Sequence, residues 1–183
     1  MSFTQAYLTR HQMCIDLKRP VPLPVLPEGY VWVPWDDRLI DLFAEVHYLS
    51  FRKALDAALF KSFANRAGCW HLINEIRRRA DFAPWATWLI ASPGGCCASI
   101  ECITIDSDEG NIQNVSVIPA FRRLGLGRAL VLQALASFKQ MKRSRVSLEV
   151  TGENLPAYQL YQRLGFRKIS TSFKEITSDD IVY

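Results

Sequence analysis

The feature that most constrains this chain is one turn between an apolar strand and a long helix. A strand-like run over residues 112–117 ends before Pro119, and a helical pattern of apolar residues runs from about 125 to 141. The first N–H groups of a helix lack intrahelical partners and carry partial positive charge, so the turn predicts an anion site. Gly125 and Gly127 let phosphate oxygens approach the backbone without meeting a Cβ.

The charges around this turn agree with an anionic ligand. Between Glu109 and Glu149 the sequence has no acidic residue and seven cations: Arg122, Arg123, Arg128, Lys139, Lys142, Arg143 and Arg145. The last four suit the C-terminal end of the predicted helix. The first three oppose the helix dipole, which indicates that something anionic offsets them.

Two familiar nucleotide-binding fingerprints do not fit the turn. The pattern G-x-G-x-x-G fails because Leu130 stands at the third glycine position, and no G-x-x-x-x-G-K-[ST] occurs in the chain. The sequence therefore argues against a dinucleotide site and a mononucleotide P-loop.

The periodicity of apolar residues predicts an α/β or α+β domain with a mixed sheet. Residues 1–29 are expected to be an extension, with a short strand over 13–17 and a Pro-rich connector, and residues 30–183 a single domain. We expect turns at 93–95 and at Glu109-Gly110. The expected strands are 30–35, 88–90, 97–105, 112–117, 146–150 and one from 166, and the expected helices are 39–52, 54–66 (ending at Gly68), 70–79, 125–141 and 155–164.

Composition excludes several classes of protein. The chain has 183 residues, 49% hydrophobic and 22% charged, which indicates a globular domain. A net charge of +4 does not by itself imply nucleic acid. No apolar run approaches the roughly 18 residues that span a bilayer, and no signal peptide is visible. Five cysteines, an odd number, indicate a reduced, cytoplasmic protein, and the histidines lack zinc-type spacing, so no metal is expected.

A second constellation follows the helix. The loop reads Arg122-x-x-Gly125-x-Gly127, and residues 154–166 read N-x-x-A-x-x-L-Y-x-x-x-G-F. Together, over about residues 87–170, these signatures resemble the GNAT superfamily of N-acetyltransferases. The L-E-V at 148–150, with Glu149 twelve residues before Tyr161, is similar to the ribosomal-protein alanine N-acetyltransferase branch.

The resemblance implies a GNAT-like, mostly antiparallel central sheet flanked by helices, with a splay between the fourth and fifth core strands. It implies acetyl-CoA as cosubstrate, no metal, and direct transfer to an amine, with Glu149 as general base and Tyr161 as general acid. The residues that it places against the coenzyme are Val115, Val117, Arg122, Arg123, Leu124, Gly125, Leu126, Gly127, Arg128, Asn154 and Ala157.

Residue chemistry leaves alternatives open. Glu149 also suits a salt-bridged position on the sheet face, Asn154 suits a helix N-cap, and Glu101 or Glu109 could be the base instead. The acceptor, which could be a peptide N-terminus, a lysine or a small amine, is expected to meet walls from residues 36–82. The candidates there are Glu45, His47, Tyr48, Phe51 and Asp56.

Two other classes of function compete with the enzyme. One is a coenzyme-A-binding regulator without turnover. The other is a nucleic-acid-binding module that uses the cations of 122–145; the aromatics are not interleaved with those cations, which argues against it. A homodimer stays open, and nothing in the sequence indicates a membrane partner.

Overall fold

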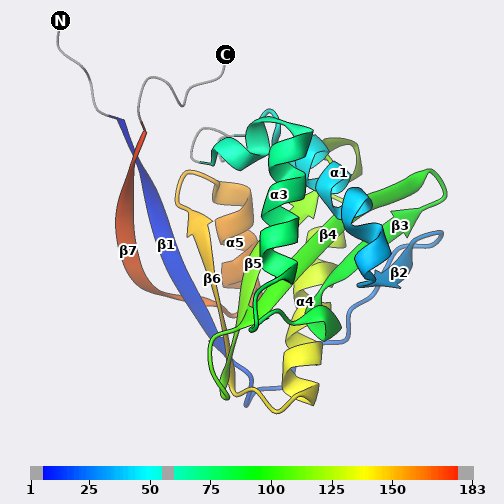
Figure 1. Ribbon diagram of the computed structural model, residues 1–183. Helices are drawn as coiled ribbons and strands as arrows, with labels where there is room; N and C mark the ends of the chain where they lie inside the picture. Colours follow the sequence, from blue (N-terminus) through cyan, green and yellow to red (C-terminus); the bar gives the residue numbers. More distant parts are fainter. Residues whose placement is uncertain (1–5, 55–59, 177–183) are drawn as a thin grey trace, which may run out of the picture.

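The computed structural model describes residues 6–54 and 60–176, which form one mixed sheet with helices on both faces (Figure 1). The strands are β1 (Ala6–Asp16), β2 (Val31–Pro34), β3 (Trp88–Ser92), β4 (Gly95–Thr104), β5 (Glu109–Val117), β6 (Arg145–Thr151) and β7 (Arg167–Ile176). The helices are α1 (Ile40–Phe51), α3 (Arg66–Arg77), α4 (Leu126–Gln140) and α5 (Leu155–Leu164). Short 3-10 turns are η1 (Asp37–Leu39), η2 (Lys61–Ala64), η3 (Pro84–Ala86) and η4 (Pro119–Phe121).

The sheet confirms the predicted mostly antiparallel architecture and its splay. The strand order is β2-β3-β4-β5-β6-β1-β7, and β5 with β6 forms the parallel pair. That pairing runs from Glu109 beside Arg145 to Ile112 beside Leu148 and ends there. The later residues of the two strands diverge, so an opening forms in the sheet.

The N-terminal segment differs from the expected extension. Strand β1 is much longer than residues 13–17 and lies between β6 and β7, antiparallel to both (Figure 1). Its register sets Arg10 opposite Thr151 and Gln12 opposite Glu149. Residues 6–16 therefore belong to the sheet, and the Pro-rich stretch that follows connects them to β2.

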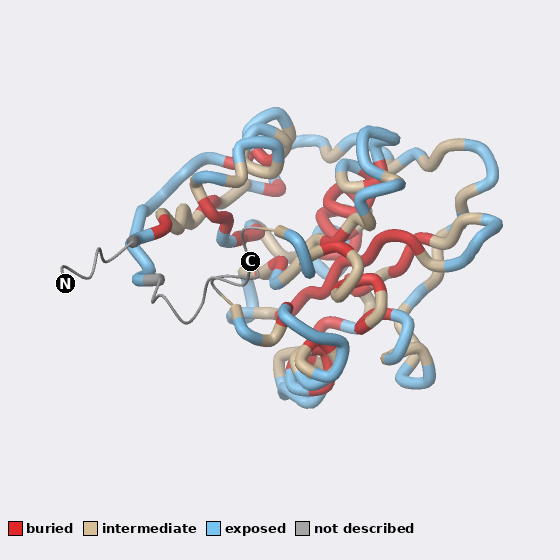
Figure 2. The backbone as a smooth tube through the Cα atoms, turned by 90° about the horizontal axis from the view of Figure 1, so that it is seen from above, coloured by how far each residue is buried: buried red, intermediate tan, exposed pale blue. Residues whose placement is uncertain are grey.

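Apolar clusters lie on both faces of the sheet, and Figure 2 shows the buried segments of the backbone in red. On one face α4 and α5 pack against the strands, with Leu130, Leu135 and Phe138 fully buried. On the other face α1 and α3 pack through Phe43 and Ile73. The apolar stripe predicted for 125–141 is buried in α4. None of the described helices is both long and apolar enough to cross a bilayer.

The expected turn at Glu109-Gly110 is wrong, because both residues open β5 and the turn lies just before them. Packing requires a residue without a side chain at position 110. A Cβ added there would lie 2.2 Å from Cε1 of Phe138, whose ring covers the strand from α4. The glycine therefore marks a close approach between helix and strand rather than a turn.

The expected helix over 54–66 is also wrong for the part that the structure describes. Residues 61–64 form η2, and α3 begins at Arg66 with Asn65 as its N-cap, whose side chain accepts from the N–H of Gly68 at 2.8 Å. Gly68 therefore lies in the first turn of α3 and ends no helix. A Cβ there would lie 2.6 Å from the Ser62 carbonyl oxygen, so only glycine lets η2 pack this closely.

The five cysteines carry free thiols. Cys69, Cys97 and Cys102 are fully buried and pack as small apolar residues. Burial raises the pKa of the Cys97 thiol to about 11, so this group stays protonated at neutral pH.

Replacing Gly110 by alanine will destabilise the fold. The added methyl overlaps the Phe138 ring, and overpacking of this kind costs about 1–3 kcal/mol. The matched control is Gly94→Ala, where the nearest atom to the new Cβ is Ser92 Oγ at 3.8 Å, and we expect a change within about 0.5 kcal/mol. Urea unfolding measures both; equal midpoints for the two variants would contradict this packing.

Candidate active site

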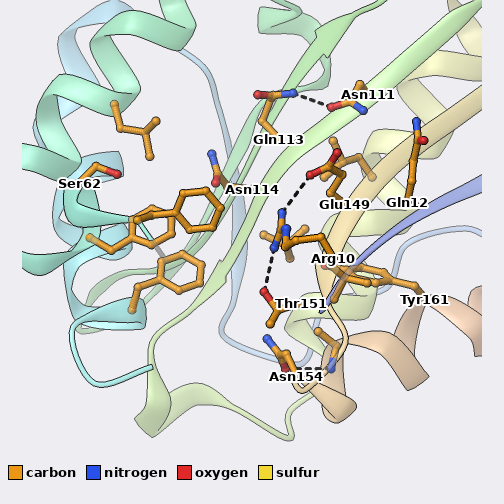
Figure 3. Close-up of a pocket in the computed structure, with 18 of the residues that line it drawn as sticks. Arg10, Gln12, Ser62, Asn111, Gln113, Asn114, Glu149, Thr151, Asn154 and Tyr161 are labelled. Atoms are coloured by element: carbon orange, nitrogen blue, oxygen red, sulfur yellow. Dashed lines mark hydrogen bonds and ion pairs between the residues drawn. The ribbon is translucent and has the colours of Figure 1, made fainter. Parts of the chain in front are cut away.

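The opening between β5 and β6 leads into a cavity of about 430 Å³. Its walls come from both faces of the sheet, because α1, η2 and α3 contribute from one face and α5 from the other (Figure 3). The described lining residues are Arg10, Gln12, Phe51, Phe60, Ser62, Phe63, Leu72, Ile76, Asn111, Ile112, Gln113, Asn114, Val115, Glu149, Val150, Thr151, Asn154, Ala157 and Tyr161.

The cavity has an aromatic wall and a polar wall. Phe51 and Phe63 stack with ring centroids 4.4 Å apart and planes at 13°, and Phe60 packs edge-on against Phe63. Across the cavity lie the polar side chains of β1, β5 and β6, among them Arg10 and Glu149 (Figure 3). Such a site can hold a ligand that is apolar on one side and polar on the other.

Glu149 reaches the cavity through the alternation of β6. Leu148 and Val150 are buried, whereas 59% of the Glu149 side chain is exposed. Its Oε2 lies 3.3 Å from a terminal nitrogen of Arg10, whose other terminal nitrogen donates to Thr151 Oγ1 at 2.8 Å. Glu149 is thus both ion-paired and part of the cavity wall.

The two competing carboxylates lie elsewhere. Glu101 is completely buried and pairs with the equally buried His47 at 2.6 Å, behind the aromatic wall. Glu109 accepts hydrogen bonds from Arg145 and Ser147 at the closed end of the β5–β6 pair. Among the described lining residues Glu149 is the acidic one, which favours it over both alternatives.

Helix α5 presents its first turns to the cavity. Asn154 is the N-cap of the helix, since its side chain accepts from the N–H of Ala157 at 3.3 Å, and both residues also line the cavity. Tyr161 is 7% exposed and lies on the same wall. Tyr158 instead packs beside the His11 ring and is partly buried against the core.

The predicted phosphate loop has the geometry of an anion site. Gly125 is the N-cap residue of α4 and has φ of +80°. No side chain at this position caps the first N–H groups of the helix. The Ala129 N–H bonds the Gly125 carbonyl, so the N–H groups of the residues between them form the start of the helix. A Cβ on Gly127 would lie 3.5 Å from Leu160, an ordinary van der Waals distance, so the first turn of α4 lies beside α5.

Arg122 has a structural task in this loop. Its guanidinium donates to the carbonyl oxygens of Val117, at 3.1 Å, and Ser50, at 2.9 Å. It therefore ties the loop to the end of α1, beside a second hollow of about 340 Å³ that Arg52 and Lys53 also line. A direct contact between Arg122 and a phosphate stays a prediction.

Strand β5 directs one backbone donor toward the opening. The Ile118 N–H bonds the Cys97 carbonyl of β4 at 3.0 Å. Adjacent N–H groups of a strand point to opposite sides, so the N–H of Val117 faces the side of β6. Because the β5–β6 pairing has ended by this point, that donor faces the opening.

The expected acceptor wall is only partly found. Phe51 lines the cavity, whereas His47 is buried behind it, Glu45 pairs with Arg66, and Tyr48 packs with the core around Phe63. Asp56 lies outside the described residues. Sequence reasoning missed Arg10 and Gln12, because a polar run such as residues 9–12 does not show that its strand joins the sheet beside β6.

Fold and site together combine an α/β sheet that is split between β5 and β6 with a glycine-bearing turn at the start of α4. The model of the Acetyltransferase (GNAT) family matches residues 43–166. The chain belongs to this family. Within the described residues no cluster of histidine, cysteine or acidic side chains could hold a metal ion.

Two relatives match different shares of this chain. Mycothiol acetyltransferase of Thermobispora bispora is 31% identical over 165 residues, which cover 83% of this chain but 51% of the relative, so the chain spans about half of that protein. The ribosomal protein bS18-alanine N-acetyltransferase of Escherichia coli is 30% identical over 106 residues, which cover 51% of this chain and 72% of the relative.

Solved structures share the fold. A GCN5-related N-acetyltransferase from Sphaerobacter thermophilus superposes with a TM-score of 0.69 at 20% identity, covering 93% of this chain and 52% of that one. Ard1 from Thermoplasma volcanium gives 0.62 at 18% identity, covering 82% of this chain and 99% of that one.

Removing one partner of the buried His47–Glu101 pair will cost stability. Glu101→Ala leaves the buried imidazole without its 2.6 Å partner, and a buried polar group that loses its hydrogen bond costs about 1–3 kcal/mol. Glu149→Ala is the control, because its pair with Arg10 is half exposed and contributes at most about 1 kcal/mol. Chemical denaturation compares the two; a similar small loss for both would show that the buried pair does not stabilise the fold.

Proposed function

We propose that this protein is an acetyl-CoA-dependent N-acetyltransferase that transfers an acetyl group directly to a primary amine. The observation that carries the proposal is the cavity at the split between β5 and β6, which Glu149 and Tyr161 both line. The domain we propose comprises residues 30–183 together with β1, whose Arg10 lines the same cavity.

The residues present fit acetyl-CoA. An uncapped helix start, Gly125 in a left-handed conformation, and the neighbouring Arg123 and Arg128 suit a diphosphate. Val115 on β5 and the α5 residues Asn154 and Ala157 line the path that a pantetheine arm would follow into the opening. The bound coenzyme supplies a thioester, which is an acyl group ready for transfer to an amine.

Glu149 is the general base of the proposed reaction. Primary ammonium groups have ordinary pKa values of about 8 for an α-amine and about 10 for lysine, so the acceptor must lose a proton before it attacks. Glu149 takes this proton directly or through a water, and its exposed position in the cavity wall allows either route.

Tyr161 and the backbone complete the reaction. As the new N–C bond forms and the C–S bond breaks, the Tyr161 hydroxyl gives its proton to the departing thiolate and later regains one from solvent. The N–H of Val117 faces the opening and donates to the oxygen that gains negative charge during the transfer.

The structure weakens the nucleic-acid alternative. Several cations that such a module would use have acceptors within the chain: Arg122, Lys139, Arg143 and Arg145 donate to carbonyl or carboxylate oxygens. A coenzyme-binding regulator without turnover differs from the enzyme only in activity, so an assay decides between them.

Glu149→Gln and Tyr161→Phe will each lower kcat by about 10²- to 10⁴-fold, because each removes a proton-transfer group. Consumption of acetyl-CoA over a panel of peptides and small amines measures this. The controls are Glu153→Gln, whose carboxylate bonds Thr9 instead, and Tyr158→Phe, which lies on the same helix; both should keep near-normal rates.

Calorimetry with coenzyme A accompanies the assay. Both catalytic variants should bind it as the wild type does. Normal turnover by both would remove the catalytic assignment, and binding without turnover of any amine would favour the regulator.

A further inference from the structure

We propose, building on the acetyltransferase function above, that Arg10 makes the cavity selective for small acceptors that carry a carboxylate beside the primary amine. Amino acids with an apolar side chain are the simplest members of this class. The inference concerns β1, a strand outside the residues 43–166 that the family model matches. It rests on where that strand places a guanidinium.

Contacts with β6 and with the Phe60 ring hold Arg10 at the edge of the opening. One terminal nitrogen donates to Thr151 and the other contacts Glu149, while the guanidinium lies over the Phe60 ring at 5.3 Å. Its side chain is 15% exposed. Lys174 on β7 lies over the same ring, with Nζ 4.1 Å from the centroid, and adds positive charge to this end of the cavity.

The contact between Arg10 and Glu149 is suited to exchange. Strong charged hydrogen bonds of this type measure about 2.7–2.9 Å, whereas this one measures 3.3 Å to a half-exposed carboxylate. The planar fork of a guanidinium matches a carboxylate that can accept two parallel bonds. An acceptor carboxylate can therefore take the place of Glu149 beside Arg10.

In the proposed reaction such an exchange opens Glu149 to the acceptor. In the structure Glu149 Oε2 faces Arg10, and the acceptor ammonium must approach the same carboxylate to lose its proton. An amine without an anionic group competes with Arg10 for Glu149. An amino acid brings a partner for each group: its carboxylate binds Arg10 and its ammonium faces Glu149.

The charges and the shape of the cavity agree with this class. Among the described lining residues the charged side chains are Arg10 and Glu149, one of each sign, which complements a zwitterion. The stacked rings of Phe51 and Phe63 form the opposite wall and suit an apolar side chain.

A matched pair of amines tests the proposal. Phenylalanine and phenethylamine differ only by the carboxylate, and the wild type should prefer phenylalanine in kcat/KM by about 10- to 100-fold, as expected for a charged hydrogen bond. Arg10→Gln should abolish this preference mainly through KM for phenylalanine, and Arg10→Lys should restore part of it. The exposed Arg163→Gln is the control and should keep the wild-type ratio.

Binding of products separates this inference from the proposed function. Calorimetry with coenzyme A present should show N-acetylphenylalanine binding more tightly than N-acetylphenethylamine, and Arg10→Gln should remove the difference. If this holds while no amine is acetylated, the carboxylate site stands and the enzyme assignment falls. Three results would each overturn the inference. The first is equal kcat/KM for phenylalanine and phenethylamine together with equal binding of their acetylated products. The second is an equal loss of kcat/KM for both amines in Arg10→Gln, and the third is a preference for phenylalanylalanine over phenylalanine.

Discussion

The short parallel pairing of β5 with β6 is the constraint on which the site depends. At its closed end side chains bind the strands together, since Glu109 accepts from Arg145 and Ser147, and Asn111 also donates to Ser147. Beyond Ile112 the ladder stops and the strands separate. A sheet that is tied at one end and open at the other provides a passage between its two faces without losing its core.

This passage explains why residues from several different elements meet at the candidate site. Glu149 lies on β6, the strand that leaves the pair, and Tyr161 lies on α5, the helix that packs behind that strand. The predicted phosphate loop begins where β5 ends. The strand β1 then supports β6 on its other side and adds Arg10 to the passage. The proposed chemistry thus needs few specialised residues, because the backbone itself supplies the path and one donor.

Short sequence patterns predicted the loop before α4 and both helices of that face. A proline, two glycines and an apolar stripe defined the loop and α4, and the N-cap at Asn154 defined α5. Contacts between residues far apart in the sequence could not be predicted from such patterns. Nothing local to Gly110 reveals that Phe138 covers it, and nothing in residues 6–16 reveals that their partners lie more than a hundred residues away. Arg10 was missed for this reason.

The most direct test of the account is a crystal structure of the protein grown with acetyl-CoA. The account predicts the diphosphate on the N–H groups at the start of α4, beside Gly125 and Gly127, and the thioester in the opening between β5 and β6, within reach of Tyr161. A coenzyme bound at another surface, or a complex in which β5 and β6 close over Val115 and Val117 and leave no passage, would contradict it.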